Sequence, residues 1–378
     1  MELLVQFAHH LVWFLVVLTI VVFFHELGHY AVARSCGVRV DIFSIGFGRE
    51  IFGFTGSSGT RWKVGLIPLG GYVKFFGDAG FASDRDTVLG QKMSDAEREI
   101  SFHHKRLAQK IAIVSAGPIA NFVLAIAILT SIFVMYGRPY TPPVIGAVLE
   151  DSAAAAAGLQ VGDTIVKINQ TRTDRFEEIR DIVIFRPEQT LDLLVIRGGM
   201  EINLRATPQL SEFTDNLGNV HQIGLLGISV GSQEYQQLMI GPALIAAIGE
   251  TYAWIERTLL GLGQIISGTR SAQELGGPIL IAQMAGDQAA NGPLSFFNFI
   301  FILSVTLGLI NLFPIPVLDG GHLLFYAIEA IRGRPLGERA QEYAYFLGLT
   351  FIVSLMIFTV VNDLSRPGVV QFFSDLIG

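Results

Sequence analysis

The sequence predicts a polytopic α-helical membrane protein with four transmembrane helices, a membrane-associated β-hairpin and an inserted β-rich domain. Hydrophobic residues make up 51% of the 378 residues and charged residues only 16%, and the mean hydropathy is +0.50. The apolar residues lie in blocks too long and too free of charge for a soluble core. A formal net charge of −7 argues against nucleic-acid binding, which needs clustered Lys and Arg.

Four blocks are long and apolar enough to cross a bilayer as helices. The first, 11–24, is apolar apart from Thr19, and the second, 111–136, contains no charged residue. The third and fourth blocks are 296–318 and 344–361. We therefore expect membrane segments at 1–33, 107–136, 295–330 and 343–363.

Basic residues near the ends of these segments predict their orientation, because cytoplasmic flanks carry an excess of Lys and Arg. They follow the first segment, precede the second, and lie between the third and the fourth. The N-terminus, the long stretch between the second and third segments, and the C-terminus then lie outside, in the periplasm of a bacterium whose inner membrane holds the chain. The basic residues are Arg34, Arg39, Lys105, Arg106, Lys110, Arg332, Arg334 and Arg339.

The segment 34–106 is expected to be a cytoplasmic loop that contains a β-hairpin. Within it, 61–75 has β-type residues on both sides of a turn signal formed by Pro68, Gly70 and Gly71. A hairpin at the membrane can offer a strand edge to an extended peptide. A hairpin without a catalytic role is the alternative.

The outer segment 140–235 alternates apolar and polar residues in short runs, such as 164–169 and 191–196, which is typical of strands. Between Ala157 and Asn169 the order A-G-L, two residues, G-D and a strand ending in I-N resembles a PDZ domain. Only one complete signature of this kind is present. PDZ domains bind extended peptide at a sheet edge, so we expect a PDZ-like domain that captures peptide termini.

The next segment, 236–294, is apolar but interrupted by charges that a buried span would not tolerate, such as Glu250, Glu256 and Arg257. Amphipathic helices at the outer membrane surface explain this composition, with Tyr252 and Trp254 at the interface.

The end of the first segment carries the motif His25-Glu26-Leu27-Gly28-His29. Two histidines four residues apart lie on one helix face and can bind one metal ion, while Glu26 beside them can take a proton from an attacking water. Polar residues that merely follow a span are the other explanation. Ionisable side chains against the hydrocarbon are costly unless they serve a site, so the position favours a metal centre.

A catalytic zinc ion usually has three protein ligands and one open position. Asp319 is the expected third ligand, because Pro314 and Pro316 remove backbone donors just before it and the helix must break there. Irregular backbone at membrane depth is tolerated only inside protein or around a cavity. His322 is the rival ligand.

These motifs together resemble the site-2 protease family of intramembrane zinc metalloproteases, in particular its RseP-like bacterial members. The resemblance rests on 25–29, on 311–321 with its Leu-Asp-Gly, on the Ala-Gly-Pro-Ile-Ala-Asn-Phe run at 116–122, on Gly-Gly-Pro-Ile at 276–279 and on the PDZ-like domain. Family members with two tandem PDZ domains are similar, but one signature is found here.

The resemblance implies roles for individual residues. His25, His29 and Asp319 match the zinc ligands, and Glu26 matches the general base. The asparagine ahead of the two prolines implies a substrate contact, and so does the hairpin. The implied substrate-binding residues are Asn311, Pro314, Pro316, Gly65, Leu66 and Ile67. Asn121 lies in a family motif as well, and helix packing through Gly117 explains that stretch equally well.

The implied activity is zinc-dependent cleavage of single-span membrane proteins within the lipid bilayer. Implied substrates are proteins of the anti-sigma factor type after a first periplasmic cut, or remnant signal peptides. A transporter would use intramembrane His, Glu and Asp as ion-pathway residues, but it has no need of the general base that Glu26 supplies. A silent scaffold presenting a PDZ-like domain leaves Asp319 unexplained.

Overall fold

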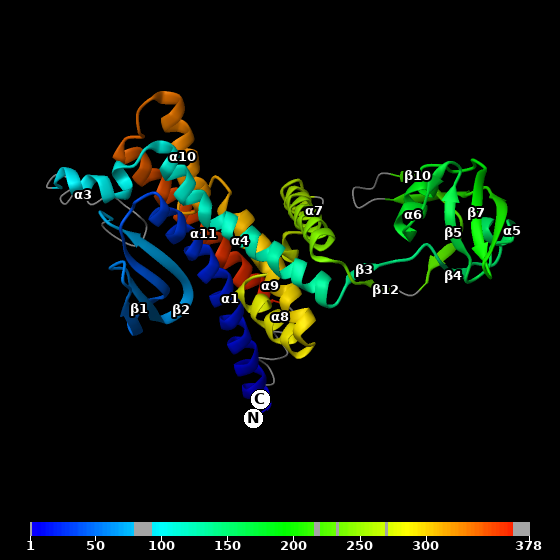
Figure 1. The fold of residues 1–378 in the computed structure, drawn as a ribbon, viewed down its shortest axis with the longest axis horizontal. Coiled ribbons are helices and arrows are strands. Elements are labelled where there is room, and N and C mark those ends of the chain that lie inside the picture. The colour runs from blue at the N-terminus through cyan, green and yellow to red at the C-terminus, as the bar shows by residue number, and fades with distance from the viewer. Residues whose placement is uncertain (1, 79–92, 215–219, 232–233, 269–270, 366–378) are drawn as a thin grey trace. The chain divides into compact units, whose positions relative to one another are not determined.

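The computed structural model describes residues 2–78, 93–214, 220–231, 234–268 and 271–365 (Figure 1). The chain divides into two compact units. The first, here called the membrane unit, comprises Met1–Thr130, Leu244–Gly263 and Ser271–Gly378. The second, the β-rich unit, comprises Ser131–Ala243 and Gln264–Arg270.

Four helices in the described residues are long and apolar enough to cross a membrane. They are α1 (Glu2–Ser35), α4 (Leu107–Met135), α9 (Pro293–Asn311) and α11 (Glu338–Leu364). This agrees with the four predicted spans, and the chain is a membrane protein. Shorter elements complete the helical part: α3 (Asp95–Ile100), η1 (Phe102–His104), η2 (Ala272–Glu274), α8 (Pro278–Ala290) and α10 (Asp319–Arg332). A further long helix, α7 (Ile240–Ile266), carries the charges noted above.

Helix α8, which lies in the region 236–294, packs against α1. Val17 and Val21 of α1 form a buried cluster with Ala285 of α8. A side chain at Gly286 would collide with the His10 ring. Ala285 and Gly286, the two small residues of α8, therefore allow its close approach to α1. An amphipathic pattern in the sequence does not indicate such a contact.

Asp363 near the end of α11 holds the beginning of α8. Its fully buried carboxylate accepts hydrogen bonds from the main-chain N–H groups of Gly277, Ile279 and Leu280 at 3.0, 3.1 and 3.0 Å. These are donors that the first turn of a helix leaves unsatisfied. Any side chain at Gly277 would meet Asp363 or the main chain of Thr359. The Gly-Gly-Pro-Ile motif is thus the start of a capped helix.

The predicted hairpin exists, but its turn was wrongly placed. Strand β1 (Val40–Thr55) pairs antiparallel with β2 (Arg61–Phe75), so the turn lies at 56–60. The Pro68 and Gly70 region lies inside β2 instead.

Pro68 fits within β2 because the ladder is interrupted there. Ile67 pairs with Phe47 and Gly71 pairs with Ile45, so three residues of β2 face only one residue of β1. Gly70 has φ +112° in this bulge. A residue without an N–H group is tolerated in a strand at such a bulge.

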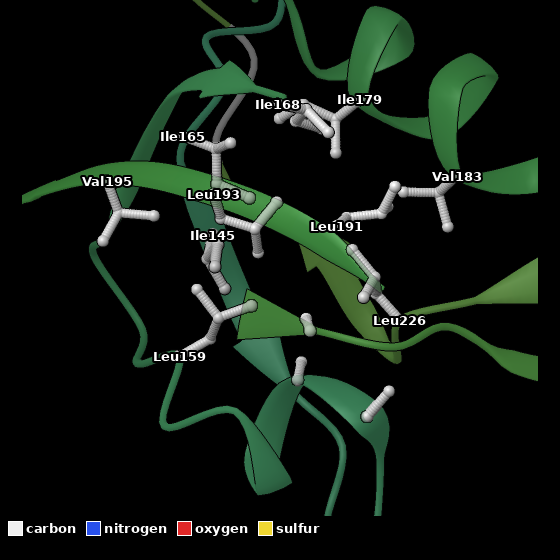
Figure 2. Close-up of a cluster of buried hydrophobic side chains, with 13 residues drawn as sticks. Ile145, Leu159, Ile165, Ile168, Ile179, Val183, Leu191, Leu193, Val195 and Leu226 are labelled. Atoms are coloured by element: carbon white, nitrogen blue, oxygen red, sulfur yellow. The ribbon is translucent and has the colours of Figure 1, made fainter. Parts of the chain in front are cut away.

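The β-rich unit is built around a four-stranded antiparallel sheet of order β6-β5-β7-β8. One face of this sheet packs under α6 (Phe176–Ile184), and Figure 2 shows the buried side chains between them, including Ile165, Ile168, Leu193 and Ile179. The strands are β5 (Thr164–Ile168), β6 (Thr171–Arg172), β7 (Leu191–Arg197) and β8 (Met200–Ala206), and α5 is Ala153–Ala156.

The segment after β8 belongs to the same unit. Strands β9 (Gln209–Thr214) and β10 (Val220–Leu225) form a hairpin, and β11 (Ile228–Val230) pairs with β4 (Ile145–Val148). Leu226 contributes to the same buried cluster. A final pair joins β3 (Arg138–Tyr140) to β12 (Glu234–Gln236).

Candidate metal centre

His25 and His29 lie on one face of α1. Their spacing of four residues places one imidazole about one turn above the other. Both are buried, with 7% and 9% of their surface exposed, and their Nε2 atoms lie 3.3 Å apart. Two histidines this close and this buried need a common partner.

Asp319 approaches the two histidines from a break between helices, as the sequence predicted. Helix α9 ends at Asn311 and α10 begins at Asp319 itself. The break folds tightly, because side chains at Gly320 and Gly321 would collide with main-chain atoms of residues 312–316. Val317 in this turn has φ +90°, a strained value for a β-branched residue.

The three side chains converge as ligands of one ion would. The Oδ2 atom of Asp319 lies 3.1 Å from Nε2 of His25 and 3.4 Å from Nε2 of His29, which makes an almost equilateral triangle with the histidine pair. In a tetrahedral zinc site with bonds of 2.0–2.1 Å, ligand atoms are about 3.3–3.4 Å apart. Oδ2 is buried and makes no hydrogen bond within the described part of the chain. The residues present therefore fit zinc.

Helix α4 orients His29. The Nδ1 atom of His29 lies 2.9 Å from the main-chain oxygen of Ile113. When Nδ1–H donates this hydrogen bond, Nε2 keeps its lone pair and is free to bind a metal. One turn further along α4, any side chain at Gly117 would collide with the His29 ring. Gly117 in the motif at 116–122 therefore leaves room for the His29 ring. The hydrogen bond to Ile113 uses a main-chain carbonyl, so no residue type marks it in the sequence.

Small residues bring α1 and α4 into contact beside the site. A side chain at Gly28 would collide with the Ala116 carbonyl and with Cβ of Ala120. Such close backbone contact is typical of helix pairs in membranes. Gly28 therefore has a packing role within the histidine motif.

Glu26, which lies on α1 with the two histidines, points toward β2. A Cβ atom at Gly71 would lie 3.1 Å from Cγ of Glu26, and the carboxylate faces the main-chain N–H of Val73. Glu26 also lies within electrostatic reach of His25, His29 and Asp319. A carboxylate in this position can exchange protons with a group bound at the histidines. The bulge of β2 lies beside it, which the sequence did not predict.

The other predicted site residues lie in several places. His322, the rival ligand, is 3.3 Å from the hydroxyl of Tyr345 and is not part of the metal-ligand group. Asn311 is half-buried at the end of α9, Pro314 is exposed and Pro316 half-buried. On β2, Gly65 is buried, and Leu66 and Ile67 expose 62% and 49% of their surface.

A buried His-His-Asp triangle with a glutamate beside it, which joins a helix apolar enough to cross a bilayer to the break after a second such helix, defines a membrane-embedded zinc metalloprotease. The chain belongs to peptidase family M50, the site-2 protease family, whose model matches residues 13–355. The resemblance found in the sequence is thereby confirmed, as are the metalloprotease activity and its zinc cofactor.

Similar proteins agree with this assignment. "Putative zinc metalloprotease Atu1380" of Agrobacterium fabrum is 45% identical over 94% of this chain and 96% of its own length. "Metalloprotease MmpA" of Caulobacter vibrioides is 37% identical over 99% of this chain and all of its own. Among solved structures, the PDZ domain of an SdrC-like protein from Listeria monocytogenes is 21% identical, covers 24% of this chain and 88% of its own, and has a TM-score of 0.19.

Proposed function

We propose that this metalloprotease cleaves single-span membrane proteins within the bilayer, with His25, His29 and Asp319 as its zinc ligands. The observation that carries this proposal is the ligand triangle itself. Its edges of 3.1–3.4 Å suit zinc, and it joins a helix long and apolar enough to span a membrane to the break that follows a second such helix. A site at that depth meets substrate segments that are themselves in the membrane.

Glu26 is the proposed general base. Zinc held by the three ligands supplies Lewis acidity, which polarises a scissile carbonyl and makes water more acidic. Glu26 takes the proton of the attacking water and later passes it to the leaving amine. The position of Glu26 between the histidines and Val73 supports this role.

Strand β2 is the proposed docking edge for substrate. A transmembrane helix hides its carbonyl groups in its own hydrogen bonds, so it must unwind before hydrolysis. Exposed apolar side chains at Leu66 and Ile67 suit a segment drawn from the bilayer, and strand addition satisfies its freed backbone groups. The proximity of Gly71 to Glu26 supports the placement of an extended substrate near the base.

The β-rich unit is proposed to act as a PDZ-like module that captures peptide termini. Helix α6 and residues 224–228, which lead into β11, line a cavity of about 160 Å³.

Two neighbouring residues at the end of α6 test this role of the cavity. Ile184 is half-buried and lines the cavity. Phe185 is 80% exposed and does not line it. Ile184→Asp should weaken binding of a peptide with an apolar C-terminus, measured by fluorescence anisotropy, whereas Phe185→Asp should not. Equal binding by all three proteins would contradict this role.

The proposed setting is a bacterial inner membrane with both termini periplasmic. The proposed substrates are proteins of the anti-sigma factor type after a first periplasmic cut, and remnant signal peptides. The basic residues that flank the spans support this orientation.

Cleavage of a co-expressed single-span reporter with a short outer tail tests the proposal. The wild-type chain should release a fragment cut within the span, while Glu26→Gln should release none and should keep its zinc. Cleavage by Glu26→Gln at the wild-type rate would remove Glu26 from the mechanism. A cut outside the span would show that the protease does not act within the bilayer.

A further inference from the structure

Asn121 is a fully buried polar residue on α4, and its side chain faces His25. Together with Ile113 and Gly117 it forms a row at every fourth position, which lies on one face of a helix. The first two members of the row contact His29. Asn121, one turn further along, contacts the other histidine.

The contact between Asn121 and His25 involves the imidazole nitrogen that faces away from the ligand triangle. The carboxamide Nδ2 of Asn121 lies 3.2 Å from Nδ1 of His25. The carboxamide Oδ1 is buried and has no hydrogen-bond partner among the described residues. A buried amide oxygen without a donor is costly and calls for an explanation.

The chemistry of a metal-binding imidazole decides which amide atom faces His25. If Nε2 is to bind a cation, Nε2 must carry the lone pair and the neutral ring carries its hydrogen on Nδ1. An N–H group needs an acceptor, and of the two carboxamide atoms only Oδ1 accepts. A half-turn of the Asn121 carboxamide exchanges Nδ2 for Oδ1 in nearly the same place. The half-turn also gives Oδ1 its missing partner.

We infer that Asn121 is a positioning residue of the metal centre, whose Oδ1 accepts a hydrogen bond from Nδ1–H of His25 and holds that ring in its metal-binding tautomer. It does for His25 what the Ile113 carbonyl does for His29. This inference rests on the proposed zinc ligands and adds the group that selects the state of one of them.

The main chain of Asn121 is itself fixed. The hydroxyl of Ser304 on α9, fully buried, donates to the main-chain oxygen of Asn121 at 2.8 Å. Gly308, one turn further along α9, has no side chain, and a Cβ atom there would lie 3.3 Å from Cβ of Asn121. A carboxamide on so constrained a backbone can hold an imidazole ring in one orientation.

Two substitutions separate acceptance of a hydrogen bond from mere packing. Asn121→Leu keeps the approximate volume and removes the acceptor, and Asn121→Asp keeps an acceptor and removes the donor. The experiment measures the rate at which the full-length protein in detergent releases zinc to a chelator. Asn121→Leu should release zinc about 10- to 100-fold faster, as loss of a hydrogen bond to a ligand does elsewhere. Asn121→Asp should stay within a few-fold of the wild type.

Controls keep the outcomes distinct. Thr130→Val replaces a polar side chain on the same helix that donates to the Ile126 carbonyl, and this variant should release zinc at the wild-type rate. Wild-type release by Asn121→Leu, or equally fast release by Asn121→Asp, would overturn the inference. His25→Ala is measured in parallel: if it retains zinc fully, the proposed ligand set fails, and if it loses zinc while both Asn121 variants retain it, only this inference fails.

Discussion

The Nδ1 atom of His29 lies 2.9 Å from the main-chain oxygen of Ile113. This contact is one of those that tie α1, the helix with the two histidines, to α4. A main-chain carbonyl cannot be removed by substitution, so the orientation of His29 tolerates changes in the side chain at position 113. Substitution of Gly117 should be far less tolerated, because the His29 ring lies over it and leaves no room for a side chain.

Gly117→Ala is therefore expected to damage zinc binding directly. The added methyl group would collide with the His29 ring and displace Nε2 from the triangle, so zinc release to a chelator should speed up by about tenfold or more. Gly249→Ala on α7, where nothing lies within 4 Å of the new atom, is the matched control. Wild-type zinc retention by Gly117→Ala would show that the ring can move without cost.

Loss of a proposed zinc ligand should weaken zinc binding more strongly than Gly117→Ala does. His25→Ala and Asp319→Asn should each leave the purified protein with a small fraction of the wild-type zinc content, because each removes one of the three converging atoms. Zinc content is measured by elemental analysis after dialysis against a weak chelator. His322→Ala should keep its zinc, because His322 contacts Tyr345 instead. Unchanged zinc in both ligand variants would mean that other residues bind the ion.

Gly71→Ala should separate catalysis from metal binding. The new methyl carbon would lie 2.8 Å from the main-chain oxygen of Ser44, 2.9 Å from Cγ1 of Val22 and 3.1 Å from Cγ of Glu26. It should therefore move β2 relative to Glu26 and leave the histidines in place. Reporter cleavage should fall about 10- to 100-fold, as expected for a small misplacement of a catalytic group, with zinc content unchanged. Cleavage at the wild-type rate would show that Glu26 and β2 are not coupled.

The β-rich unit contains an ion pair whose effect on stability should depend on pH. The fully buried Asp163 accepts two hydrogen bonds from Arg197, at 2.7 and 2.8 Å, and these lower the pKa of the Asp163 carboxyl. Because the folded pKa lies below the unfolded value of about 3.9, the stabilisation is complete above that value and is lost as pH falls below it.

Asp163→Asn tests this pair. It should speed hydrogen exchange of the β5 and β7 amides in the full-length protein at pH 6, measured by mass spectrometry and corrected for intrinsic rates. The difference from the wild type should shrink as the pH is lowered from 5 to 3. Arg205→Gln, which affects an exposed pair with Asp192, should change exchange much less. A difference that stayed constant with pH would rule out the ionised carboxyl as its source.

The cap on α8 gives a prediction about stability alone. Asp363→Asn replaces one of the two acceptor oxygens by an NH₂ group, so at least one of the three main-chain donors loses its acceptor. This should destabilise the membrane unit by about 1–3 kcal/mol. Thermal unfolding in detergent measures this effect, with Asp95→Asn on the exposed start of α3 as the control. Equal melting temperatures would show that the bonds contribute nothing.

The sequence alone predicted what depends on local pattern. Long apolar blocks predict spans, two histidines four apart predict a shared ligand face, and two prolines predict the break before Asp319. It did not predict the contacts of His29 with Ile113 or of Glu26 with Gly71. A main-chain carbonyl is present at every residue and a glycine has no side chain, so neither indicates from the sequence which residue it will contact. Packing between distant segments decides these contacts. The hairpin turn was misplaced for a related reason, since proline and glycine mark a bulge as readily as a turn.

His25 and His29 lie near the beginning of the chain and Asp319 near its end. A ribosome therefore makes the two histidines long before the residue that completes their site. Until Asp319 is made, the growing polypeptide lacks the carboxylate that we propose as the third zinc ligand. On that proposal, the order of the residues along the chain delays assembly of the metal centre until late in synthesis.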